Sequence, residues 1–76
     1  MKVLNTVMRK GFNLNQSLTI IKRINKHLNF CMENKQNYDE TLFYVKQDFN
    51  FKDIESIMIE CMEEDEVLYN YFDANC

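Results

Sequence analysis

Proline and tryptophan are absent from this sequence of 76 residues, and Gly11 is its only glycine. Hairpins and tight turns usually recruit glycine for a positive φ angle and proline for a fixed one, so a fold built on β-sheet is disfavoured. The lack of glycine also excludes the glycine-rich loops that cradle phosphates in nucleotide-binding enzymes. Helix interiors need neither residue, and the composition therefore predicts an all-α protein.

Long apolar runs are missing as well. No stretch approaches the roughly 18 apolar residues of a membrane span, and the opening residues MKVLNTVMRKGF contain no apolar core of a signal peptide. The cysteines, Cys31, Cys61 and Cys76, are odd in number and lack CxxC spacing, a pattern typical of reduced thiols. We therefore expect a cytoplasmic protein with no role at a membrane.

Residues of catalytic or metal-binding type are few. His27, the only histidine, precedes Cys31 by one helical turn, but this pair supplies only part of the ligand set of a zinc site. The contiguous carboxylates of Glu63–Glu66 splay around a helix, whereas acid–base catalysis needs carboxylates that converge in a cleft. The sequence thus predicts no catalytic residue, no metal ligand and no cofactor, and we expect the protein not to be an enzyme.

Apolar residues recur at helical spacing along most of the chain. The pattern predicts a short helix over residues 2–10 that ends at Gly11. It also predicts a long amphipathic helix from about residue 16 to 34, with Asn15 as a candidate cap. Asn37, which is followed by acidic residues, is typical of the N-terminus of a third helix.

The last third of the chain predicts one more helix, beginning near Phe51 with Asn50 as its cap. This helix meets the acidic cluster Glu63–Glu66, where we expect a bend, and resumes over Val67–Phe72, which is also β-prone in composition. The sequence thus predicts a single helical domain over residues 1–76, a small three- or four-helix bundle. The alternative fold is a helix-turn-helix-like domain with a short C-terminal strand.

Charge is divided unequally between the two halves of the chain. Residues 1–37 carry seven bases and one acid, a net charge of +6, whereas residues 38–76 carry two bases and eleven acids, a net charge of −9. Such asymmetry indicates charged partners or self-association. One interpretation is internal: the second helix packs on the fourth, and opposed charges line their contact at about 0–1 kcal/mol per exposed pair.

A second interpretation assigns the acidic half to a larger protein that presents a basic surface. Carboxylates would accelerate the encounter and exposed aromatic residues would hold the complex. The candidate residues are Glu63, Glu64, Asp65, Glu66, Leu68, Tyr69, Tyr71 and Phe72. In the opposing interpretation of this segment, Leu68 and Phe72 close the core. Binding of a larger protein through the acidic half predicts a small non-catalytic regulator or inhibitor. The many Asn, Lys and Ile residues imply A/T-rich codon usage, which is consistent with a viral or mobile-element gene.

A third interpretation is a helix-turn-helix-like transcriptional regulator that binds DNA. Lys22, Arg23 and Lys26 would then contact phosphates, and Asn25 and Asn29 would read adenine edges. The net charge of −3 disfavours direct binding to nucleic acid. Head-to-tail association of the basic half of one chain with the acidic half of another, for example in a homodimer, is a further alternative.

Overall fold

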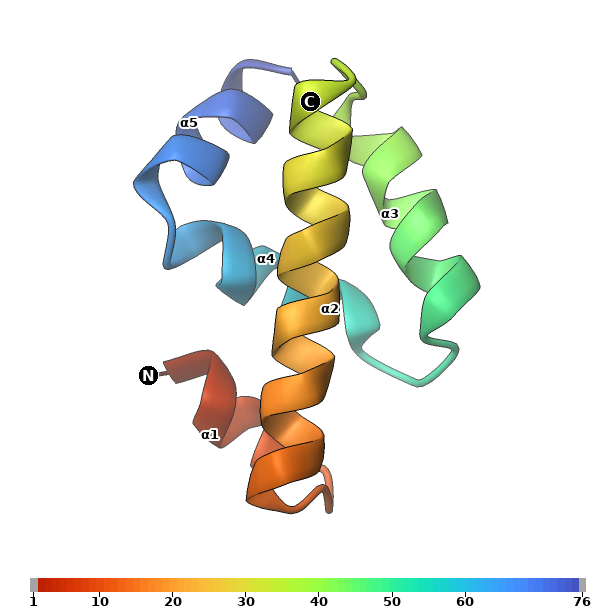
Figure 1. Ribbon diagram of the computed structural model, residues 1–76, viewed down its shortest axis with the longest axis vertical. Helices are drawn as coiled ribbons and strands as arrows, with labels where there is room; N and C mark the ends of the chain where they lie inside the picture. Colours follow the sequence, from red (N-terminus) through yellow and green to blue (C-terminus); the bar gives the residue numbers. More distant parts are fainter. Residues whose placement is uncertain (1, 76) are drawn as a thin grey trace.

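The computed structural model describes residues 2–75, and within that range the chain forms five helices and no strand (Figure 1). The helices are α1 (Lys2–Met8), α2 (Leu14–Glu33), α3 (Tyr38–Asp48), α4 (Ile54–Glu63) and α5 (Glu66–Ala74). The all-helical prediction is confirmed. The predicted count of three or four helices was too low, and the alternative of a C-terminal strand is wrong because Val67–Phe72 lie within α5.

Helix α2 is the central element of the fold. Its 20 residues, at about 1.5 Å of rise each, give a length of about 30 Å, close to the longest dimension of the chain, 33 Å. In Figure 1, α1 and α5 lie on one side of α2, α3 lies on the other, and α4 passes behind it. Each of these four helices contacts α2.

The hydrophobic core lies mainly between α2 and α4, with contributions from the other three helices. The apolar stripe predicted for the long helix is buried, and five of the ten residues of α4, which packs on α2, are buried as well. Full burial of a large aliphatic side chain contributes about 1.5–3 kcal/mol, so this seam supplies much of the stability. The buried apolar residues of these two helices are Ile20, Ile21, Ile24, Leu28, Cys31, Ile54, Ile57, Met58, Cys61 and Met62.

Two helices begin with a capping box. The Asn37 side chain accepts a hydrogen bond from the Glu40 backbone N–H, and the Glu40 carboxylate accepts one from the Asn37 N–H, both at 2.9 Å. This confirms the cap predicted for the third helix. The cap of α2 is Asn13 and not Asn15, because Gln16 stands at the position that completes a capping box with Asn13. Helix α2 therefore starts at Leu14, two residues before the predicted position.

The predicted start of the fourth helix is wrong. Helix α4 begins at Ile54, and its N-cap, Asp53, has a φ of 67° and makes no side-chain cap hydrogen bond. The Phe51 ring packs between Phe12 and Phe49, with ring centroids 5.7 and 6.0 Å away. Apolar contacts made by this ring therefore outweigh the capping preference of Asn50, and the chain turns once more before the helix starts.

The acidic cluster lies at the break between α4 and α5. The predicted bend is confirmed, and it is sharp enough to end one helix and start another. The Asp65 carboxylate caps α5 by accepting hydrogen bonds from the backbone N–H groups of Val67 and Leu68, at 3.0 and 3.2 Å. Because of this break, α5 folds back onto α2 and α4 and buries Leu68 and Phe72.

Candidate interaction surfaces

His27 and Cys31 do not form a catalytic or metal-binding pair. The His27 Nε2 atom lies 2.9 Å from Asp48 Oδ2 on α3, whereas Cys31 is buried in the core, where burial raises the pKa of its thiol. Burial, together with the nearby carboxylates of Glu64 and Glu60, raises the pKa of the Cys61 thiol to about 12. No group of three or more metal-ligating side chains is present among residues 2–75. None of the five helices combines the length and apolar character needed to cross a membrane.

The ion pairs of the chain connect different helices from those predicted. Lys10 Nζ lies 3.0 Å from Asp53 Oδ2, and Lys2 Nζ lies 4.0 Å from Glu60 Oε1, so the first helix and the turn after it are joined to the start and middle of α4. Arg23 of α2 pairs with Asp48 of α3. Helices α2 and α4 pack together as expected, but among residues 2–75 no ion pair joins one to the other.

Most of the predicted acidic binding segment has a structural task within the fold. Glu64 Oε2 accepts a hydrogen bond from the Val3 backbone N–H at 2.8 Å, and Asp65 caps α5. Leu68 and Phe72 have exposed fractions of 1% and 3%, so both side chains belong to the core. The Tyr71 hydroxyl donates a hydrogen bond to the Gln36 carbonyl at 2.7 Å. Of the predicted residues, Glu63, Glu66 and Tyr69 remain exposed without such a task.

These exposed residues form part of a surface that we call the acidic face. A shallow pocket of about 160 Å³ lies between α4 and α5 at its centre. It is lined by Tyr38, Ile59, Met62, Glu63, Tyr69, Phe72 and Asp73. Glu55, one helical turn before Ile59, accepts a hydrogen bond from the Tyr38 hydroxyl at 2.6 Å and extends the face. The acidic face therefore brings carboxylates and apolar side chains together from α3, α4 and α5.

Sequence reasoning missed Tyr38, Glu55 and Ile59 as members of this face. A signal for the last two was present, because Glu55, Ile59 and Glu63 follow one another at intervals of four residues. Residues with that spacing share one face of a helix, and the buried stripe of α4 uses the other positions. Tyr38 is half-buried and borders the pocket from the first turn of α3.

The predicted DNA-contacting residues of α2 border different depressions of the surface. Asn25 is half-buried in a depression beside Val3 and Glu64, whereas Lys26 borders a groove on the side of α3. The Asn29 amide donates a hydrogen bond to the Asn25 carbonyl at 2.8 Å. Asn25 and Asn29 are therefore not arranged beside the lysine and arginine side chains of α2 as a pair that could read nucleotide bases. If α3 and α4 are taken as a helix-turn-helix, the recognition helix is α4, and it exposes carboxylates that a phosphate backbone would repel.

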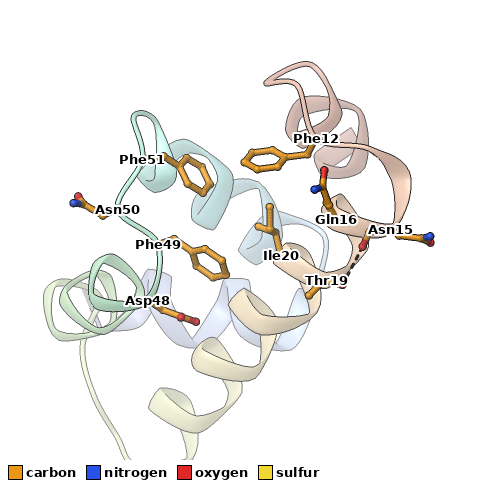
Figure 2. A pocket seen from close by; sticks show the side chains of 9 residues that line it. All are labelled: Phe12, Asn15, Gln16, Thr19, Ile20, Asp48, Phe49, Asn50 and Phe51. Carbon is orange, nitrogen blue, oxygen red and sulfur yellow. Dashed lines mark hydrogen bonds between the residues drawn. The ribbon is translucent and has the colours of Figure 1, made fainter.

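A third surface feature is an open groove of about 560 Å³ beside the start of α2. Figure 2 shows the rings of Phe12, Phe49 and Phe51 on one side of it and Ile20 of α2 facing them. Polar side chains occupy its rim, and Figure 2 shows those of Asn15 and Asn50 directed away from the groove. Because Phe51 contacts both Phe12 and Phe49, the three rings form a continuous apolar wall at this end of the core.

Comparisons with known protein families, with curated protein sequences and with solved structures found no match to this chain. The functional interpretation therefore depends on the residues that the fold brings together. Two surfaces combine charge with exposed apolar groups: the acidic face between α4 and α5, and the groove between α2 and α3.

Proposed function

We propose that this protein is a non-catalytic regulator or inhibitor that binds a larger protein through its acidic face, in a complex of equal stoichiometry. The observation that supports the proposal is the convergence of Glu63, Ile59 and Tyr69 around one pocket. Ile59 and Tyr69 have exposed fractions of 38% and 48%. Apolar side chains with this exposure, beside exposed carboxylates, are suited to contact a surface that is both apolar and basic.

Charge and apolar contact have different tasks in such a complex. The carboxylates of Glu63 and Glu66 attract a basic surface over long range and raise the association rate, an effect that added salt screens. Tyr69 has a large rigid ring, and residues of this type supply much of the affinity in interfaces once they are desolvated. The proposal thus predicts fast association that depends on salt, and slow dissociation that depends on the tyrosine.

The pocket also restricts the chemistry of the partner. Its volume of about 160 Å³ is similar to that of a cavity of about 150 Å³ that binds benzene in another protein. A pocket of this size accepts one apolar side chain. We infer that the partner inserts a single aliphatic or aromatic side chain between α4 and α5 and surrounds it with lysine or arginine residues that face Glu55 and Glu63.

The proposal is tested with two variants of the acidic face and two matched controls. Glu63→Lys and Tyr69→Ala are each expected to reduce affinity for the partner by about tenfold or more. Glu33→Lys and Tyr44→Ala change an exposed glutamate and an exposed tyrosine elsewhere, and we expect both to leave affinity unchanged. The partner is first isolated from the cells that encode the protein, under reducing conditions and after nuclease treatment, and its stoichiometry is measured.

Binding constants are then measured by titration with the purified partner, with helicity of each variant checked by circular dichroism. Equal affinity of the wild-type protein and of Glu63→Lys and Tyr69→Ala would contradict the proposed surface. So would a greater loss in the control variants than in the acidic-face variants.

A further inference from the structure

The groove between α2 and α3 combines cations with exposed aromatic rings. We call it the basic-aromatic groove. Its volume is about 450 Å³, and it is lined by Arg23, Lys26, His27, Phe30, Tyr44 and Asp48. Four of these residues come from α2 and two from α3, so the groove follows the seam between these helices. It lies away from the acidic face, with which it shares no lining residue.

We propose that the basic-aromatic groove binds single-stranded nucleic acid, with phosphates at its cationic end and unstacked bases on its aromatic end. This inference is independent of the acidic face and of the partner proposed for it. The combination of a positively charged track and aromatic platforms is what proteins use to hold single strands without strong sequence preference.

The cationic end is available to phosphates. Lys22 and Lys26 are exposed, and neither ammonium group has an ion-pair partner among residues 2–75. They lie one helical turn apart, about 6 Å along the axis of α2, and thus on the same side of it. Arg23 adjoins them and is held in place by Asp48 and by the Phe49 ring, whose centroid lies 5.1 Å from the guanidinium carbon.

Asp48 is the carboxylate that lines the groove, and its charge is offset within the fold. One of its oxygens pairs with Arg23, and the other lies 2.9 Å from the His27 ring nitrogen. An incoming phosphate therefore meets Lys22 and Lys26 first and meets Asp48 only behind the Arg23 guanidinium. This arrangement gives a local positive charge on a chain whose net charge is −3.

The aromatic end presents ring surface that the fold does not use. Phe30, Phe43 and Tyr44 have exposed fractions of 59%, 60% and 43%. Phe43 and Tyr44 contact each other edge to face, with centroids 5.9 Å apart. Phe30 follows Lys26 by one helical turn, so the rings continue the line of cations along α2. A strand laid along this line would place its backbone near the lysines and a base near Phe30 and Tyr44.

Single strands fit these features better than duplexes or acidic peptides. Bases in a duplex are stacked on one another and offer only their edges. Helix α2 has no base-reading pair at this groove, because Asn25 lines a different depression, beside Val3 and Glu64. The carboxylates of an acidic peptide would pair with the cations alone, and such a peptide has no flat group that would stack on Phe30 and Tyr44. The exposed rings therefore decide in favour of unstacked bases.

The test is fluorescence anisotropy with a labelled oligothymidine of about 12 nucleotides, titrated over a series of salt concentrations. Neutralising about three phosphates predicts a slope of about −2 in a plot of log K against log salt. Lys26→Ala should reduce the magnitude of that slope by about 0.7. Tyr44→Ala should weaken binding by roughly 5- to 150-fold and leave the slope unchanged, since stacking involves no counterion release.

The controls separate this site from general charge effects and from the acidic face. Lys52→Ala removes an exposed lysine elsewhere, and Tyr69→Ala removes an exposed tyrosine of the acidic face; both should bind the oligonucleotide as the wild-type protein does. Phe30→Ala should repeat the loss seen with Tyr44→Ala. The inference is overturned by the absence of salt-dependent binding or by equal binding of a duplex of the same length. It is also overturned if a polyglutamate peptide binds as tightly as the oligonucleotide and the same variants abolish binding of the peptide.

Discussion

Ser17 carries a hydroxyl group that has no hydrogen-bond partner among residues 2–75, although the residue is fully buried. A buried polar group without a partner loses its hydration and gains nothing in exchange, at a cost of about 1–3 kcal/mol. Thr41, the other fully buried hydroxyl residue, is different, because its Oγ1 donates to the Asn37 carbonyl at 2.8 Å. At the scale of single residues, these two hydroxyls should therefore respond to removal in opposite ways.

Ser17→Ala is expected to raise the free energy of unfolding by about 1 kcal/mol, because it removes the unpaired hydroxyl and keeps a small side chain. Thr41→Val is expected to lower it by about 1 kcal/mol, because the hydrogen bond at the start of α3 is lost. Both values are measured by urea denaturation monitored by circular dichroism. A loss of stability in Ser17→Ala would show that the serine hydroxyl is paired in solution.

At the scale of single residues, the pKa values and reactivity of the cysteine thiols also depend on burial. Cys61 is 2% exposed, and burial raises the pKa of its thiol to about 12 from an ordinary value of 9.0. A folded-state pKa above that of the unfolded state means that the neutral thiol contributes stability below pH 9.0, and that this contribution is lost as the pH rises from there toward 12.

In a Cys76→Ser variant, Cys31 and Cys61 should therefore resist a thiol reagent at pH 8 until denaturant unfolds the chain. Unfolding stability should also fall above pH 9.0 in this variant, and fall less when Cys61→Ala is added. Rapid labelling of Cys61 under native conditions would contradict its placement in the core.

At the scale of helices, Lys35 shows how a chain with one glycine ends its longest helix. The backbone N–H of Gln36 donates to the Cys31 carbonyl at 2.8 Å, and that of Lys35 donates to Met32 at 3.1 Å, which together form a Schellman motif. Lys35 stands at the left-handed position of this motif, with a φ of 57°. Glycine is preferred there because a side chain costs about 1–2 kcal/mol in this conformation.

Lys35→Gly is thus expected to raise the melting temperature and to stabilise the fold by about 1 kcal/mol. Lys26→Gly, in the middle of α2, is the matched control and should destabilise the fold by about 1 kcal/mol. Differential scanning calorimetry of both variants measures the two effects. Equal destabilisation by both substitutions would show that α2 does not end in this motif.

The helices also show which parts of the fold can be predicted from sequence. The stripes of α2 and α4 follow from apolar spacing, and Asn37 was identified as a cap because acidic residues follow it in the first turn. The cap at Asn13 was missed because Asn15, two residues later, is also a suitable cap residue. The start at Ile54 was missed because Asn50 is a suitable cap residue for an earlier start. Phe51 packs against rings from two other segments, and local propensity does not contain that contact.

At the scale of the whole molecule, the candidate sites were less predictable than the helices. Glu63 and Tyr69 were named from composition, but their convergence with Tyr38 and Ile59 depends on α5 folding back at Asp65. Pairing between Arg23 and Asp48 likewise depends on the packing of α3 on α2. Leu68 and Phe72 are buried, and of the two only Phe72 still borders the pocket. The sequence did not decide this, since a segment with apolar or aromatic side chains at nearly every position does not reveal which side the core takes.

The same ion pairs argue against association of the two charged halves between chains. Lys2, Lys10 and Arg23 already have acidic partners within their own chain, so three of the seven cations of the basic half are engaged before a second copy is met. We expect a mass of 9.2 kDa by light scattering at tens of micromolar protein under reducing conditions. A doubled mass that disappears on addition of salt would support head-to-tail association instead.

The most direct test of the acidic face is a photocrosslink made in the cells that encode the protein. A Tyr69→p-benzoylphenylalanine variant places the reactive group beside the pocket between α4 and α5, and a Phe43→p-benzoylphenylalanine variant places it on an exposed position of α3 as the control. The proposed function predicts one dominant protein adduct from position 69 that is lost when Glu63→Lys is added, and no such adduct from position 43. A protein adduct from position 43 alone would contradict it.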